Sequence, residues 1–141
     1  MKPVQYIILN KGLGMSTGKA SAQTAHASLG AYENFNTVDN AEIVEAWWNS
    51  GHTKIVLEAR DTEHLLMVER YLNERGIKTH LIIDEGRTEI APHTPTALAS
   101  VIVDKTDENV QMAFGDLKTY KDSGPTPDRT EPPGWLKRFG I

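Results

Sequence analysis

The chain has 141 residues, a net charge of −4 and no cysteine. This length suits one domain with a single core, and the lack of cysteine excludes disulfides and thiolate metal sites and fits the cytoplasm. The net charge argues against nucleic acid as a partner, but residues 1–32 hold three lysines and no carboxylate, which predicts a positive region on an acidic protein. The only early apolar run, VQYIIL, is too short to span a membrane.

Apolar, β-branched runs alternate with segments of helical periodicity along the chain. Strands are predicted over residues 4–9, 54–59, 79–83 and 96–103. Helices are predicted over residues 18–33, 40–48, 61–76 and 107–114. We expect a single α/β domain with a four-stranded β-sheet and helices on both faces. The sheet should be mixed, because the link after the third strand is short for a parallel crossover. The domain is expected to cover residues 1–121, followed by a proline-rich C-terminal tail over residues 122–141.

The segment NKGLGMSTGKASAQTAHA, residues 10–27, leads from the first strand into the first helix. Gly18 and Lys19 match the end of a phosphate-binding loop, but Leu13 and Ala20 replace its first glycine and its metal-binding hydroxyl. A Mg²⁺-dependent nucleotide site is therefore not favoured. A glycine-rich turn at a helix start still presents free N–H groups to an anion; the alternative is an exposed lysine beside a permissive glycine.

Two groups of polar residues are candidates for a site. Lys19, Gln23 and His26 follow helical spacing and share one face, either as a cleft lining or as a solvated stripe. The second group is DEGRTEIAPHTPT, residues 84–96, in which Asp84 ends a strand, the usual place for sites in α/β sheets. The alternative for this group is that Asp84 and the threonines bond their own loop. The five histidines lack metal-ligand spacing, so no metal site is expected.

Together, GMSTGKASAQTAHASLGAY and DEGRTEIAPHTPTALA resemble the type II (archaeal and eukaryotic) peptidyl-tRNA hydrolases. The resemblance runs in unbroken order over roughly residues 3–120. It implies cleavage of the ester between a peptide and the 3′-terminal ribose of tRNA, by activated water and without a cofactor or metal. It also implies peptidyl-tRNA as the partner, no membrane association, and a homodimer as a possible assembly.

The resemblance implies catalytic roles for five residues. Asp84 would position or deprotonate water, and Thr88 and Thr96 would orient that water. Lys19 would bind a phosphate or neutralise the developing oxyanion. His26 would contact the terminal nucleotide or assist proton transfer.

Three further residues are implied in substrate binding. Gly18 would lie beside the anion, Gln23 would contact the terminal nucleotide, and Arg87 would hold a phosphate or Asp84. Glu85 departs from the alanine usual in the family and adds negative charge near the site. This departure and the tail motivate the alternative of a non-catalytic RNA- or protein-binding module on the same fold.

Overall fold

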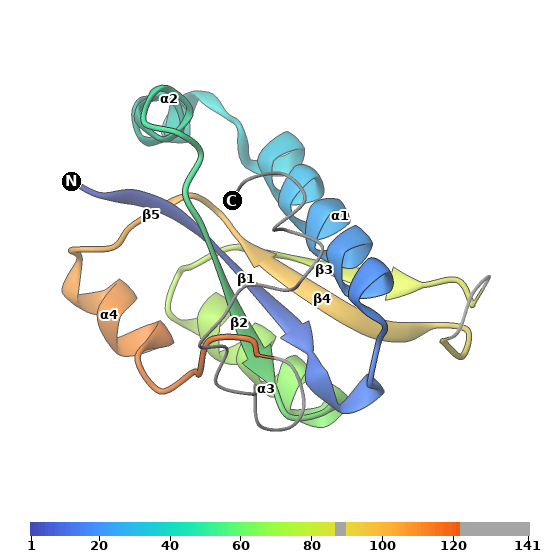
Figure 1. The fold of residues 1–141 in the computed structure, drawn as a ribbon. Helices are drawn as coiled ribbons and strands as arrows, with labels where there is room; N and C mark the ends of the chain where they lie inside the picture. The colour runs from blue at the N-terminus through green and yellow to red at the C-terminus, as the bar shows by residue number, and fades with distance from the viewer. Residues whose placement is uncertain (87–89, 122–141) are drawn as a thin grey trace, which may run out of the picture.

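The computed structural model describes residues 1–86 and 90–121 (Figure 1). Arg87, Thr88 and the tail predicted over residues 122–141 lie outside the described residues. The described chain folds as an α/β unit with a mixed sheet, and the predicted fold class is confirmed.

Four strands form the main path of the sheet, in the order β2, β1, β4, β3. Their bounds are Pro3–Asn10 for β1, Lys54–Ala59 for β2, Thr79–Asp84 for β3 and Thr94–Ser100 for β4. β1 and β2 are parallel, and β4 is antiparallel to both β1 and β3. The sheet is mixed because the short link after β3 returns the chain in the opposite direction. As a result, β1, β2 and β3 all end at the same edge of the sheet.

A fifth strand of two residues corrects the prediction of one strand over residues 96–103. β4 ends at Ser100, and β5 covers only Val103–Asp104, which pairs with the start of β1. Ser100 Oγ accepts a hydrogen bond from the backbone N–H of Tyr6 at 3.1 Å, where a ladder carbonyl would otherwise accept. The register against β1 shifts by one residue between the two strands, so the apolar run does not form one regular strand.

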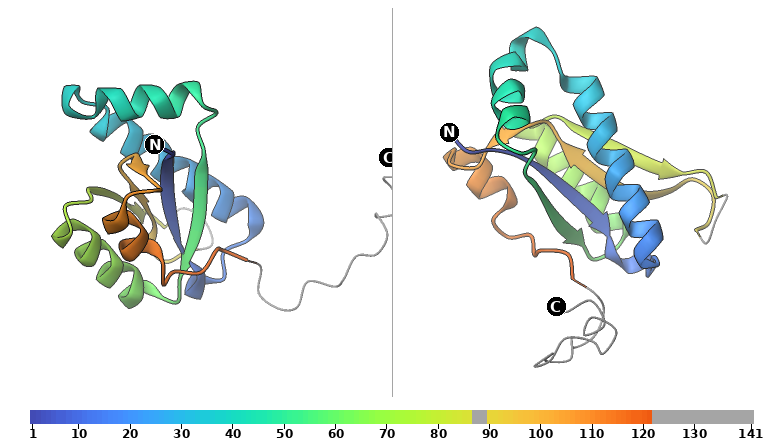
Figure 2. Two further views of the ribbon diagram at one scale, coloured as in Figure 1. Left: turned by 90° about the vertical axis from the view of Figure 1, so that its left-hand side faces the viewer. Right: turned by 45° about the horizontal axis from the view of Figure 1, so that its top comes forward.

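Helices cover both faces of the sheet (Figures 1 and 2). Their bounds are Thr17–Phe35 for α1, Ala41–Asn49 for α2, Thr62–Glu74 for α3 and Glu108–Phe114 for α4. Alternate residues of β1 face opposite sides: Ile8 packs with α3 and α4, and Ile7 packs with α1. α2 packs beside the C-terminal half of α1 through Trp47 and Tyr32. No helix in the described part of the chain combines the length and the apolar character that crossing a bilayer requires.

Small residues let α1 lie close to the sheet. Ala20, Ala27 and Ala31 are buried beneath it. One polar pair fixes its position: Ser28 Oγ donates to Gln5 Oε1 at 2.6 Å, and Gln5 Nε2 donates to the Ser28 carbonyl oxygen at 3.1 Å. Gln5 belongs to β1 and is fully buried, so this reciprocal pair ties the helix to the central strand.

Replacing Ser28 with alanine should therefore weaken the fold. The substitution leaves the buried Gln5 Oε1 without its donor, which costs about 1–3 kcal/mol of unfolding free energy. Chemical denaturation measures this loss. Ser21→Ala is the matched control, because Ser21 is exposed and its hydroxyl bonds only the Thr17 carbonyl of its own helix. Equal stability of the two variants would contradict the role given to the pair.

Candidate active site

The two predicted groups of polar residues meet at the edge of the sheet where the parallel strands end. β3 ends there at Asp84, and α1 begins beside it after a short 3₁₀ turn over Lys11–Leu13. Ser16 caps α1, because its hydroxyl accepts the backbone N–H of Lys19 at 3.2 Å. This cap places Lys19 in the first helical turn, where the helix carries no acidic residue. Asp84 thus lies at the end of its strand, as predicted, at the edge where sites in α/β sheets usually occur.

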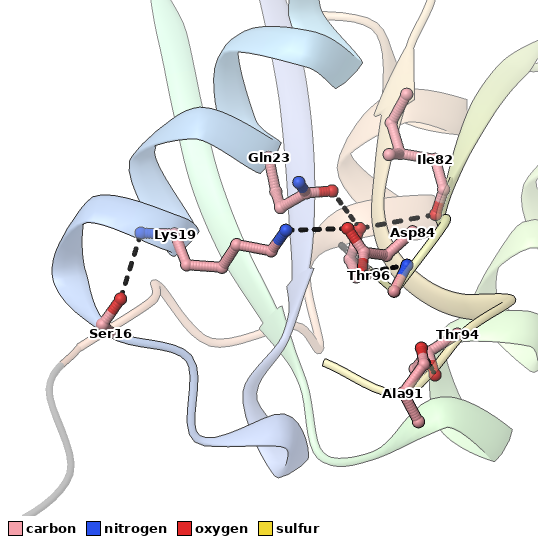
Figure 3. A network of polar contacts seen from close by, with 9 residues as sticks. Ser16, Lys19, Gln23, Ile82, Asp84, Ala91, Thr94 and Thr96 are labelled. Atoms are coloured by element: carbon pink, nitrogen blue, oxygen red, sulfur yellow. Dashed lines mark hydrogen bonds and ion pairs between the residues drawn. The ribbon is translucent and has the colours of Figure 1, made fainter. Parts of the chain in front are cut away.

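Lys19 and Asp84 form a direct ion pair (Figure 3). Lys19 Nζ donates to Asp84 Oδ1 at 2.7 Å, across 65 positions of sequence. The two side chains are only 10% and 9% exposed. The candidate site is thus a nearly buried pair of opposite charges, and the exposed-lysine alternative is wrong.

Hydrogen bonds hold Asp84 in its ionised form. The bond from Lys19 is the largest cause that lowers the pKa of Asp84, and a bond from the Gly86 N–H to Oδ2 at 2.9 Å lowers it further. Burial acts in the opposite direction and does not outweigh them. Asp84 therefore remains a carboxylate at neutral pH.

A β-bulge turns Thr96 toward α1. Ile82 pairs with Ala97 and Ile83 pairs with Pro95, so Thr96 is the extra residue between them. Its hydroxyl donates to Gln23 Oε1 (Figure 3), and both residues are buried. Bulges of this kind often occur beside active sites, where they redirect a side chain. The result is a second polar link between α1 and the β3–β4 hairpin.

Thr94, two residues earlier, has a different role. Its hydroxyl donates to the Ala91 carbonyl at 2.7 Å (Figure 3). The alternative that the threonines bond their own loop is correct for Thr94. For Thr96 it fails, because the hydroxyl bonds Gln23 on another element.

Gly18 and His26 are exposed on α1. A Cβ atom at Gly18 would meet nothing within 4 Å beyond its chain neighbours and the backbone of its own helix, so neither packing nor backbone conformation demands glycine there. His26 follows Lys19 and Gln23 along the helix, but within the described residues it makes no hydrogen bond to either motif. The structure therefore brings Lys19 and Gln23 to the second motif and leaves His26 facing solvent.

Two neighbours of the site were not among the predicted site residues. Gly86 supplies the N–H to Asp84, and Asn10 ends β1 at the same edge. Asn10 is fully buried and donates from Nδ2 to the Pro95 carbonyl at 2.9 Å, directly before Thr96. The rule that pointed to Asp84, a polar residue at the end of an apolar strand, points equally to Asn10.

The geometry gives no support for a nucleotide site of the phosphate-loop type. Lys19 is paired with a carboxylate, and the buried Ala20 stands where the metal-binding hydroxyl would be. In residues 1–86 and 90–121, no three histidine, aspartate or glutamate side chains come together as a metal site.

Comparison with known proteins places the chain in a family. The family model described as "Peptidyl-tRNA hydrolase PTH2" matches residues 3–120. The "Peptidyl-tRNA hydrolase" of Halobacterium salinarum is 40% identical over 116 residues, which is 82% of this chain and 98% of that protein. That of Methanopyrus kandleri is 37% identical over 113 residues, 80% of this chain and 94% of that protein. The "Probable peptidyl-tRNA hydrolase 2" of Dictyostelium discoideum is 36% identical over 116 residues, 82% of this chain and 54% of that protein. The chain belongs to the peptidyl-tRNA hydrolase PTH2 family.

Proposed function

We propose that this protein hydrolyses the ester bond of peptidyl-tRNA, or of N-blocked aminoacyl-tRNA, and releases free tRNA and peptide. The observation that carries the proposal is the contact between Lys19 and Asp84, which joins the two motifs of the family into one site. An ester hydrolase needs a positioned water and a group that stabilises the developing oxyanion. The pair offers both functions within a few ångströms.

Asp84 is better suited to positioning water than to deprotonating it. A general base works best when its pKa lies near the working pH, and the pKa of Asp84 is lowered below its ordinary value. As a fixed carboxylate, it accepts a hydrogen bond from water and aims the water's lone pair at the ester carbonyl. In this proposal Thr96, and Thr88 from outside the described residues, orient the same water.

Lys19 supplies the positive charge. Its ammonium has three N–H donors and gives one to Asp84, and in this proposal the others donate to the substrate. The N-terminus of α1, which has no acidic residue in its first turn, adds the positive end of its dipole. Both favour an oxyanion or a phosphate at this point, and the open space above Gly18 lets such a group approach the helix start.

The remaining predicted residues contact the RNA end in this proposal. Gln23 accepts a hydrogen bond from the Thr96 hydroxyl through Oε1, and its amide N–H groups are assigned to the terminal nucleotide. His26 is exposed on the next turn, which supports contact with that nucleotide over a fixed role in proton transfer. Arg87 is assigned to a phosphate.

The setting of the reaction belongs to the same proposal. We place it in the cytoplasm, where peptidyl-tRNA arises, and a homodimer is the assembly that the family resemblance implies. The competing function is a non-catalytic RNA- or protein-binding module, for which Glu85 beside the site is the motivation.

Removing Lys19 should raise the pKa of Asp84. In Lys19→Ala the main cause of the lowered pKa is gone, while burial, which raises it, remains. Carboxyl ¹³C NMR titration of the variant measures the change. Lys11→Ala is the matched control, because Lys11 pairs with Glu58 at 2.9 Å instead. An Asp84 titration that is the same in both variants would refute the electrostatic coupling.

Lys19→Ala and Asp84→Asn should each lower kcat/KM for N-blocked aminoacyl-tRNA by at least about 100-fold, the low end for a positioned catalytic group. Lys11→Ala should stay close to the wild type, because its charge is balanced by Glu58 on β2. Circular dichroism establishes that the variants are folded. Full activity in either site variant would exclude the assignment.

Hydrolysis should persist when metal ions are removed. Wild-type protein incubated with N-blocked aminoacyl-tRNA and EDTA is expected to release the acyl group at an undiminished rate, since the described site contains no metal-ligand cluster. Release of the label from acid-precipitable tRNA is the readout. Binding without release would favour the non-catalytic module, and loss of release on chelation would overturn the metal-free mechanism.

A further inference from the structure

A pocket of about 410 Å³ lies between α1 and α2. Thr24, Ser28 and Tyr32 line it from α1, Trp48 lines it from α2, and His52 and Lys54 line it from the segment that enters β2. None of its described lining residues belongs to the Lys19 and Asp84 site. The pocket therefore opens on the other side of α1 and has no role in the chemistry proposed above.

Aromatic rings make up one wall of the pocket. The Trp48 ring is stacked on Tyr32 at 5.6 Å between centroids and lies 4.2 Å from the His52 ring. Trp47 is 3% exposed and anchors the wall through a hydrogen bond from Nε1 to the Thr53 carbonyl. Trp48, in contrast, is 52% exposed, so it presents a large, rigid ring surface to whatever enters.

The backbone holds His52 against this wall. His52 has a φ of 57°, in the left-handed region that non-glycine residues rarely adopt. Its N–H donates to the Trp47 carbonyl at 3.0 Å, which fixes the tight turn after α2. The rings are therefore pre-arranged by the fold.

The charge at this pocket suits a polyanion. Lys54 Nζ lies 5.2 Å from the Trp47 ring centre and donates to the His52 carbonyl at 3.1 Å, so an ammonium group stands at the rim. No carboxylate is among the described lining residues, and α1 carries none before Glu33. Glu45 lines a neighbouring hollow, which shares Tyr32 and Trp48 with this pocket but not Lys54.

We propose that this aromatic pocket binds an unpaired nucleobase of RNA. Proteins hold single-stranded RNA by stacking bases on aromatic rings while cations contact the backbone, and the pocket offers both. This inference rests on the proposed function, and the base that it assigns to the pocket lies upstream of the 3′-terminal nucleotide. Lys19 and Tyr32 are 13 positions apart on one helix, or roughly 20 Å along its axis, so the two sites hold different nucleotides of the same strand.

The surface of α1 between the two sites leaves a path for the strand. Ala22, Ala25, His26 and Leu29 are exposed there, and none is negatively charged. An RNA strand can cross this face without meeting a carboxylate. A second protein copy is a less suitable occupant, because a stable interface buries about 800 Å² on each partner, whereas this feature is a recess of about 410 Å³ between two helices.

The test compares Trp48→Ala and Trp48→Phe with the wild type in the full-length protein. The probe is a short single-stranded RNA with the 3′-terminal sequence of tRNA, titrated at fixed ionic strength. Trp48→Ala should weaken binding roughly 5- to 150-fold, the loss expected for one stacked base, and Trp48→Phe should restore most of the affinity. With N-blocked aminoacyl-tRNA, Trp48→Ala should raise KM and leave kcat nearly unchanged.

Tyr71→Ala is the matched control. Tyr71 is a 41% exposed aromatic residue on α3, on the opposite face of the sheet, and its loss should not change RNA affinity. Unchanged affinity and KM in Trp48→Ala would overturn the proposal. Tighter RNA binding by Trp48→Ala would instead assign the pocket to another segment of the chain. A change in its sedimentation without a change in RNA affinity would assign the pocket to a second copy. Either result would also overturn the proposal.

The experiment separates this inference from the proposed function. If the wild type binds the RNA in a Trp48-dependent way but releases no acyl group, hydrolysis is refuted and the pocket assignment stands. If the wild type releases the acyl group and Trp48→Ala has unchanged affinity and KM, only the pocket assignment is refuted.

Discussion

The ion pair between Lys19 and Asp84 is the interaction on which the site depends. Removing two charges from water costs several kcal/mol per ion, and a buried pair recovers this cost only with good geometry and further hydrogen bonds. Here the 2.7 Å contact and the Gly86 N–H provide them. Apolar residues of similar size would hold the helix to the sheet equally well, so stability alone does not account for the pair. A fixed carboxylate beside a fixed ammonium, at the edge where the parallel strands end, suits ester hydrolysis, because one group can position water and the other can stabilise an oxyanion.

Much of the fold follows from local patterns in the sequence. Strand and helix periodicity predicted the order of the main elements, and the short link after Asp84 predicted the antiparallel return. The run over residues 96–103 was predicted as one strand because it is almost entirely apolar and has no glycine or proline to interrupt it. Its interruption coincides with a hydrogen bond from Tyr6 to Ser100, 94 positions apart, and with a shift of register against β1, and no local pattern contains either.

The sequence predicted the residues of the candidate site but not which of them are in contact. Lys19 at a helix start and Asp84 at a strand end are local signals, whereas their meeting depends on how α1 crosses the sheet. Thr94 and Thr96 are alike in sequence and would share a face of a regular strand. The bulge opposite Ile82 and Ile83 separates them, so that one bonds its own loop and the other bonds Gln23. Such a register shift arises from pairing with β3, and composition carries no sign of it.

Because Asp84 is a weak base, the proposed mechanism depends mainly on the positions of the water and the ester. A carboxylate with a lowered pKa contributes little by removing a proton, so the proposed mechanism draws its rate from holding water and ester in line and from the charge of Lys19. Binding energy from the aromatic pocket acts equally before and during the reaction, so it lowers KM and does not itself supply that alignment. A base held in the aromatic pocket, on the other side of the same helix, would restrain the RNA strand across the exposed face of α1. Because the reciprocal bonds between Ser28 and Gln5 fix α1 on the sheet, one rigid element would set the distance between the point of attachment and the ester.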